Sequence, residues 1–222
     1  MRAWRVRAWW LVVVAAVAFV AGAVAPRLVR HRQPTPEVTA SPVYRMQVDH
    51  FARLPDGPTV VMLGDSITAW GQWAELLGEP VANRGVPGDT SSGVLARVSG
   101  VPRSARVVFL MIGTNDLGIK RPVAEVAANT RRIVAALPGR VVVESVLLRS
   151  NPAVDGNIAE LNAANAAFCR SGACDYLDVQ QAVQPHMAAS LDGLHLTGAA
   201  YDAWAQQLRL WLVSRKPPSK TS

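Results

Sequence analysis

The stretch TVVMLGDSIT, residues 59–68, constrains the fold more than any other part of this 222-residue chain. Its first five residues, Thr59–Leu63, are apolar or β-branched, which is typical of a strand buried on both faces of a parallel sheet. Gly64 ends this run, and Asp65 and Ser66 follow where the chain turns into the next helix. Open α/β sheets bind ligands at the carboxyl ends of their strands, so Ser66 stands at a candidate site. A serine in this place can also serve only as a helix N-cap, so the rest of the chain must supply further evidence.

Strand-like and helix-like segments alternate along most of the chain. The expected strands are residues 59–63, 81–83, 106–112, 140–148 and 176–179. The expected helices are residues 44–54, 67–77, 91–98, 122–137, 157–169 and 198–213, and residues 180–196 have an irregular pattern. Strands that alternate with helices imply a parallel sheet covered on both faces through right-handed crossovers. The sequence therefore predicts an α/β fold with a mostly parallel five-stranded sheet.

A hydrophobic segment precedes this domain. Residues 8–25 carry no charge and follow an Arg-rich start, and 18 residues are just enough to span a bilayer as one hydrophobic helix. Trp4, Trp9 and Trp10 suit an interfacial belt, which favours an uncleaved membrane anchor. The alternative is a cleaved signal peptide, because residues 21–23 (Ala-Gly-Ala) resemble a cleavage site. Arginines flank the segment on both sides, so the positive-inside rule does not fix its orientation.

Either interpretation places the domain outside the cytoplasm if the amino terminus stays inside. We expect a single-pass membrane protein with an extracytoplasmic domain, or alternatively a secreted protein. The expected organisation is an anchor or signal peptide at residues 1–28, a Pro- and Thr-containing linker at 29–43, a hydrolase domain at 44–214 and a disordered basic tail at 215–222.

The formal net charge of +7 does not indicate nucleic-acid binding, because the excess lies at the ends of the chain. Residues 1–32 hold six Arg and no acidic residue, which leaves 17 basic against 16 acidic residues in the remainder. Two cysteines occur, Cys169 and Cys174, with Ser-Gly between them. This spacing suits a small disulfide-closed loop in an exported protein, and two free thiols packed as small hydrophobes are the alternative. No second Cys or His pair has the spacing of a zinc site.

A serine nucleophile needs a base within hydrogen-bond reach and a group that orients the base. His195 is the candidate base, since it lies near the carboxyl terminus in the sequence LDGLHLTG. Asp192 precedes it by three residues, and side chains at positions i and i+3 can meet in a turn. The alternative for this pair is a helix-capping aspartate beside an exposed histidine.

Hydrolysis also needs donors directed at the oxyanion that develops in the transition state. The candidate donors are the N–H of Ser66, the side-chain amide of Asn115 after the third strand, and the N–H of Gly85 after the second. Asn115 and Gly85 could instead be ordinary turn residues. Asp65 is expected to act as a cap or to lie near the substrate, and Trp70 either lines an acyl pocket or packs in the core.

Four short blocks carry a resemblance to a known family. GDSIT (64–68), NRGVPGDT (83–90), GTND (113–116) and DGLHLT (192–197) resemble the blocks of the SGNH, or GDSL, hydrolases, in the family's order. The similarity extends over residues 44–213, and the region around the first block is similar to the small bacterial branch that includes platelet-activating-factor acetylhydrolase-like proteins.

The resemblance implies a flavodoxin-like three-layer α/β/α sandwich and acyl-ester hydrolysis without metal or cofactor. It implies Ser66 as nucleophile, His195 as base, Asp192 as its orienting acid, and Gly85 and Asn115 as oxyanion donors. By the same analogy we expect a serine esterase for short, acetyl-type esters. The alternatives are an O-acyltransferase or O-deacetylase of cell-envelope glycans and a catalytically silent, membrane-tethered binding module. The expected partners are an acyl ester, an acylated glycan or lipid, and the membrane through the N-terminal helix.

Overall fold

The computed structural model of the chain describes residues 38–149, 151–187, 190 and 192–215. The predicted hydrophobic helix, most of the predicted linker and the tail beyond Arg215 lie outside these residues. Within the described part of the chain, no helix combines the length and apolar character needed to cross a bilayer.

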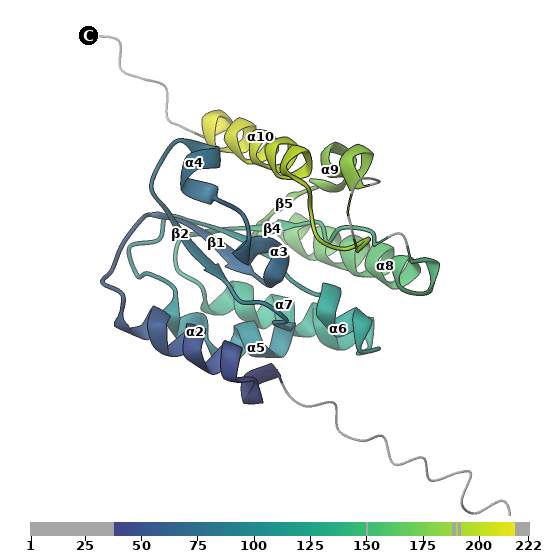
Figure 1. The fold of residues 1–222 in the computed structure, drawn as a ribbon, viewed down its shortest axis with the longest axis horizontal. Coiled ribbons are helices and arrows are strands. Elements are labelled where there is room, and N and C mark those ends of the chain that lie inside the picture. Colours follow the sequence, from purple (N-terminus) through teal and green to yellow (C-terminus); the bar gives the residue numbers. More distant parts are fainter. Residues whose placement is uncertain (1–37, 150, 188–189, 191, 216–222) are drawn as a thin grey trace, which may run out of the picture. The chain divides into compact units, whose positions relative to one another are not determined.

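A five-stranded, fully parallel sheet forms the centre of the domain, with the strand order β2-β1-β3-β4-β5 (Figure 1). The strands are β1 (Val60–Gly64), β2 (Val81–Gly85), β3 (Val107–Met111), β4 (Arg140–Glu144) and β5 (Asp175–Leu177). The chain changes direction across the sheet at β1, which pairs with both β2 and β3. This is the flavodoxin-like order, whose ligand site lies at that switch point. The predicted α/β fold is confirmed.

Helices cover both faces of the sheet (Figure 1). On one face lie α4 (Trp73–Leu77), α9 (Gln180–Met187) and α10 (Gly198–Ser214). On the other lie α2 (Pro42–Arg53), α5 (Ser91–Ala96) and α7 (Val123–Ala136), with α8 (Pro152–Phe168) beside α7. Alternate residues of β1 point into the two separate cores, Met62 toward Trp204 and Leu63 toward Ile133. Because both faces of β1 are buried, every position of this strand is apolar or small.

The predicted helix at residues 67–77 is instead two short helices, α3 (Ser66–Ala69) and α4. The side-chain amide of Asn83 on β2 donates to the carbonyls of Thr68, Ala69 and Gly71, at 3.3, 3.1 and 3.2 Å. These carbonyls would otherwise accept bonds within a continuous helix. The asparagine therefore ends α3 after one turn and fixes it to the neighbouring strand.

Other elements also differ from the prediction. Residues expected to be irregular form α9, because Val183 and Met187 pack into the core below α10. The helix α8 begins at Pro152 instead of residue 157, since the Asn151 side chain caps it by accepting from the N–H of Ala153 at 3.1 Å. The block GTND opens a short helix, α6 (Thr114–Gly118), that was not predicted. β4 ends at Glu144, four residues before the predicted end at Leu148.

Candidate active site

Ser66 begins α3 directly after β1, at the carboxyl edge of the sheet. The preceding residue, Asp65, is the N-cap of this helix, and its carboxylate accepts the N–H of Ile67 at 3.0 Å. Asp65 is buried, and burial raises its pKa to about 7. The hydroxyl of Ser66 is 3.0 Å from Nε2 of His195. These two residues are 129 positions apart in the sequence, and the fold brings their side chains together.

The loop before α10 holds His195 through the carboxylate of Asp192. One oxygen of that carboxylate accepts the N–H groups of Leu194 and His195, at 2.9 and 2.8 Å. The other lies 2.5 Å from Nδ1 of His195. These bonds to the charged form, led by those from His195, hold the pKa of Asp192 well below its usual range. An ionised carboxylate only accepts, so Nδ1 carries the proton and Nε2 is left to accept from Ser66.

The oxyanion side of the site differs in part from the prediction. Nδ2 of Asn115, on α6, donates to the backbone oxygen of Asp89 at 2.8 Å, which fixes the amide with its second hydrogen still available. The N–H of Gly85, however, donates to Oδ1 of Asn83 at 2.9 Å. A Cβ on Gly85 would lie 2.2 Å from the backbone nitrogen of Ala69. The missing Cβ therefore makes room for α3, and the structure does not present Gly85 as a free donor.

Gly88, three residues after Gly85 in the loop that follows β2, is a candidate donor that sequence reasoning missed. It is exposed and has a positive φ of 77°, which favours glycine. No hydrogen bond between described residues uses its N–H. The carbonyl of the next residue, Asp89, accepts from Asn115, so Gly88 directly precedes a residue that contacts Asn115. The second glycine of the NRGVPGDT block was the available signal, and spacing alone did not distinguish it from the first.

Two buried carboxylates, Asp89 and Asp116, anchor this loop. The carboxylate of Asp89 contacts Nε of Arg97 at 2.7 Å, and both side chains are at least 97 % buried. Nη2 of Arg97 donates to the carbonyl of Gly64 at 3.0 Å, which links the pair to the end of β1. Asp116 accepts from the N–H and the hydroxyl of Ser91, both at 2.8 Å. Burial raises the pKa of Asp89 to about 6 despite its arginine partner.

Trp70 and Asp65 differ in their relation to the site. Trp70 is 50 % exposed, and its ring centroid lies 4.0 Å from that of His195, so it is not a core residue. It lines a pocket of about 340 Å³ together with Asp192, His195, Leu196 and Thr197. Asp65 is 1 % exposed and does not line this pocket, because its carboxylate turns inward to cap α3.

Cys169 and Cys174 are joined by a disulfide between the end of α8 and β5. Within residues 38–149, 151–187, 190 and 192–215, no cluster of three or more His, Cys, Asp or Glu side chains is arranged to hold a metal ion. The constellation around Ser66 thus consists of a hydroxyl, an imidazole, a carboxylate and amide donors, the groups that acyl transfer requires.

Residues 62–203 match the model of the GDSL-like Lipase/Acylhydrolase family. The fold is similar to that of a Streptococcus pneumoniae protein provisionally described as a platelet activating factor, with TM-score 0.67 and 21% identity over 88% of this chain and 99% of that one. It is also similar to Est24, a carbohydrate acetylesterase from Sinorhizobium meliloti (TM-score 0.58, 16% identity, 70% of this chain and 98% of that one). A third neighbour is a catalytic mutant of Axe2, an acetylxylan esterase from Geobacillus stearothermophilus (TM-score 0.59, 17% identity, 70% and 94%). Among curated proteins, none matches this sequence.

The match covers well over half of the chain, from β1 to α10. The protein therefore belongs to the GDSL-like lipase/acylhydrolase family and is an SGNH-type carboxylic ester hydrolase.

Proposed function

We propose that the protein is a serine esterase in which Ser66, His195 and Asp192 form the catalytic triad. The observation that carries this proposal is the continuous chain of hydrogen bonds from the Ser66 hydroxyl to Nε2 of His195 at 3.0 Å, and from Nδ1 to the Asp192 carboxylate at 2.5 Å. It joins a nucleophile, a base and the group that orients the base, in the arrangement that acyl transfer through serine requires.

In the proposed mechanism, Nε2 of His195 takes the proton of the Ser66 hydroxyl as the oxygen attacks the ester carbonyl. The tetrahedral intermediate collapses by breaking the bond to the alcohol, which leaves with the proton returned from His195. Water then attacks the acyl-enzyme by the same route and releases the carboxylic acid. Asp192 stabilises the imidazolium that forms in each half-reaction.

The oxyanion is held by donors at three positions. Ser66 is the first residue of α3, where the backbone N–H has no partner within the helix. Asn115 offers its second amide hydrogen, because the first is already bonded to the carbonyl of Asp89. We assign the third position to the N–H of Gly88 instead of that of Gly85, since Asn83 already accepts the latter.

The test is the Ser66→Ala variant. We expect turnover of a soluble ester such as nitrophenyl acetate to fall by about 10⁴–10⁶, because the covalent route is lost. Labelling of the wild-type protein by a fluorophosphonate probe should vanish in the same variant. Ser171→Ala, at an exposed serine far from the loop of His195, is the matched control and should label and turn over normally. An unlabelled wild-type protein would instead favour the silent binding module.

The pocket beside His195 bears on the substrate. At about 340 Å³ it fits a short acyl or small leaving group, which supports acetyl-type esters. A second candidate function, O-deacetylation of a carbohydrate, is favoured by Trp70, because its half-exposed ring next to His195 offers a flat apolar surface on which a sugar ring can stack. The acetylesterase neighbours act on carbohydrates by name, which fits this candidate.

A substrate panel with Trp70→Ala and Trp70→Phe separates the two candidates. For carbohydrate deacetylation we expect kcat/KM on acetylated oligosaccharides to fall about tenfold in Trp70→Ala and to recover in Trp70→Phe, with nitrophenyl acetate little affected. Equal effects on both substrates would contradict the sugar platform. A preference for long-chain nitrophenyl esters in the wild type would contradict the short acyl group. Transfer of the acyl group to an added glycan, seen in product analysis, would identify the acyltransferase alternative.

The proposal extends to location: the domain acts outside the cytoplasm, tethered by or released from the segment at residues 8–25. The apolar run supports this, as does the disulfide between Cys169 and Cys174, since such bonds persist in oxidising compartments. Amino-terminal sequencing of the mature protein distinguishes anchor from signal peptide, and a reduced, cytoplasmic protein would contradict both.

A further inference from the structure

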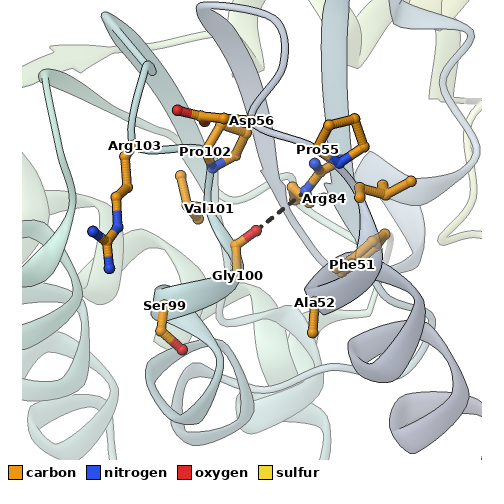
Figure 2. A pocket seen from close by; sticks show the side chains of 11 residues that line it. Phe51, Ala52, Pro55, Asp56, Arg84, Ser99, Gly100, Val101, Pro102 and Arg103 are labelled. Carbon is orange, nitrogen blue, oxygen red and sulfur yellow. Dashed lines mark hydrogen bonds between the residues drawn. The ribbon is translucent and has the colours of Figure 1, made fainter.

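A second pocket, of about 220 Å³, lies away from Ser66, between the end of α2 and the loops that precede β1 and β3 (Figure 2). These loops are at the amino ends of the strands, whereas Ser66 follows the carboxyl end of β1. The lining combines apolar groups with two arginines and one carboxylate. The residues are Phe51, Ala52, Leu54, Pro55, Asp56, Arg84, Ser99, Gly100, Val101, Pro102 and Arg103.

Arg84, on β2, is the unusual member of this lining. It is only 6 % exposed, yet no carboxylate among the described residues lies within 4.0 Å of its guanidinium group. Its recorded partners are the carbonyls of Gly100 and Asn83, at 3.4 and 3.2 Å, and the ring of Phe51, 5.0 Å away. Figure 2 shows the side chain reaching into the pocket beside Phe51 and Gly100. Two of the five N–H groups of Arg84, on Nε and Nη1, donate to these carbonyls. The other three, which include both on Nη2, have no hydrogen-bond partner among the described residues.

The neighbouring charged groups do not neutralise the positive charge of Arg84. Arg97 also packs on Phe51, but its charge is matched by Asp89. Burial and the positive charge of Arg97 lower the pKa of Arg84, which reflects the cost of keeping an unmatched cation there. The single carboxylate in the pocket, Asp56, accepts from the N–H and hydroxyl of Ser104 and forms no ion pair with Arg84. A buried charge without a counter-ion is costly, and a small anion that enters the pocket would remove that cost.

We propose that this pocket binds a phosphate group, with Arg84 as its principal ligand. An arginine presents parallel N–H groups that match phosphate oxygens bidentately, and three of the five N–H groups of Arg84 have no hydrogen-bond partner among the described residues. Arg103 is exposed and Figure 2 shows its guanidinium group turned away from Arg84, so its positive charge favours a multiply charged oxyanion only through long-range attraction. The pocket has room for a phosphate with a small substituent, so both free phosphate and a glycerol phosphate headgroup share the required chemistry. This site is independent of the proposed esterase activity.

The experiment is thermal unfolding of the full chain in neutral detergent, titrated with inorganic phosphate or sn-glycerol 3-phosphate at constant ionic strength set by chloride. At about ten times the Kd we expect Tm to rise by about 3–6 °C. Arg84→Gln should weaken phosphate binding at least about tenfold, because charge-assisted bonds are lost. Arg106→Gln is the matched control, since Arg106 is exposed, lies outside this pocket and should leave binding unchanged. Stronger binding of glycerol phosphate identifies a headgroup, and equal or weaker binding identifies free phosphate.

A readout on the wild-type protein keeps the proposal testable if Arg84→Gln does not fold. Phosphate should shift the amide NMR signals of Gly100, Val101 and Arg103 saturably, and leave those of Ser66 and His195 in place. The proposal is overturned if phosphate gives no saturable stabilisation beyond chloride, if Arg84→Gln binds as well as wild type, if acetate stabilises equally well, or if the shifts centre on Ser66.

Discussion

The two sides of the candidate active site are built in different ways. Ser66 and Asn115 follow central strands and rest on buried charged groups, with Asp89 and Asp116 fully enclosed. His195 and Asp192 lie on one short loop before α10, where the side chains are 24 % and 51 % exposed. The nucleophile side is therefore positioned by tertiary packing, and the histidine side mainly by hydrogen bonds among nearby residues of one loop, Ser190, Asp192, Leu194 and His195.

This difference separates stability from activity. A change on the histidine side breaks local bonds that contribute little to the free energy of unfolding, because they are exposed to water. A change on the nucleophile side disturbs groups buried in low dielectric, where an unpartnered atom is costly. Residues of one catalytic unit should thus respond differently to substitution.

Among the variants that test this difference, Asp192→Asn should have the largest effect on turnover. Turnover should fall by about 10³–10⁴, because the amide cannot hold the imidazole in the required tautomer or stabilise its charged form. Tm should stay within about 2 °C of wild type, since the carboxylate is exposed. Steady-state kinetics measures the turnover and calorimetry measures the Tm, both on the same preparation. A large loss of stability would show that the loop is not locally determined.

Asn115→Ala should lower both turnover and stability. We expect kcat to fall by about 10²–10³ through loss of one oxyanion donor. Unlike Asp192→Asn, it should also lower the free energy of unfolding by about 1 kcal/mol, because the carbonyl of Asp89 loses its partner. Urea unfolding measures this second effect. An unchanged kcat would remove Asn115 from the proposed oxyanion hole.

The smallest effect on turnover concerns Glu144, a buried carboxyl at the end of β4 that accepts from Nε1 of Trp204 at 2.5 Å. Burial raises its pKa to about 8, whereas Asp192 is shifted down. The folded protein therefore keeps a proton that the unfolded chain has lost between about pH 4.5 and pH 8, and this group makes stability fall as pH rises through that window.

Glu144→Gln cannot ionise, so its stability relative to wild type should increase by about 4 kcal/mol between pH 5 and pH 9. Urea unfolding at the two pH values gives the difference. The exposed Glu160→Gln on α8 is the control and should show no such change. A constant difference between Glu144→Gln and wild type would mean that the carboxyl is already ionised at pH 5.

Patterns among neighbouring residues predict much of this structure. The continuous apolar run of β1 and the spacing of Asp192 and His195 are properties of neighbouring residues, so the strand and the contact between these two side chains could be anticipated. The position of a strand end also predicted where Ser66 lies. Such features depend on few long-range contacts, which is why sequence reasoning reaches them.

Features that depend on one distant side chain could not be anticipated. Asn83 ends α3 through carbonyls 12 to 15 residues away, which no local pattern indicates. Its bond to the N–H of Gly85, two residues on, is a local contact that the sequence Asn-Arg-Gly allows but does not require. The helix α9 likewise forms because Val183 and Met187 meet α10, although residues 180–196 have no clear apolar period. The sequence therefore predicts Gly85 as an oxyanion donor, whereas its N–H is bonded to Asn83, and we propose Gly88 in its place.

The engagement of Gly85 by Asn83 has a consequence for hydrogen exchange. Gly85 at the end of β2 and Gly88 in the loop that follows differ in the fate of their amide protons, since that of Gly85 is bonded and buried and that of Gly88 is exposed. The Gly85 proton is protected by its bond to Asn83 and by the close packing of α3 on Gly85, while that of Gly88 exchanges at nearly the rate of an open chain. The exchange rate of Gly85 should therefore report on opening of the junction between β2 and the helix that carries Ser66.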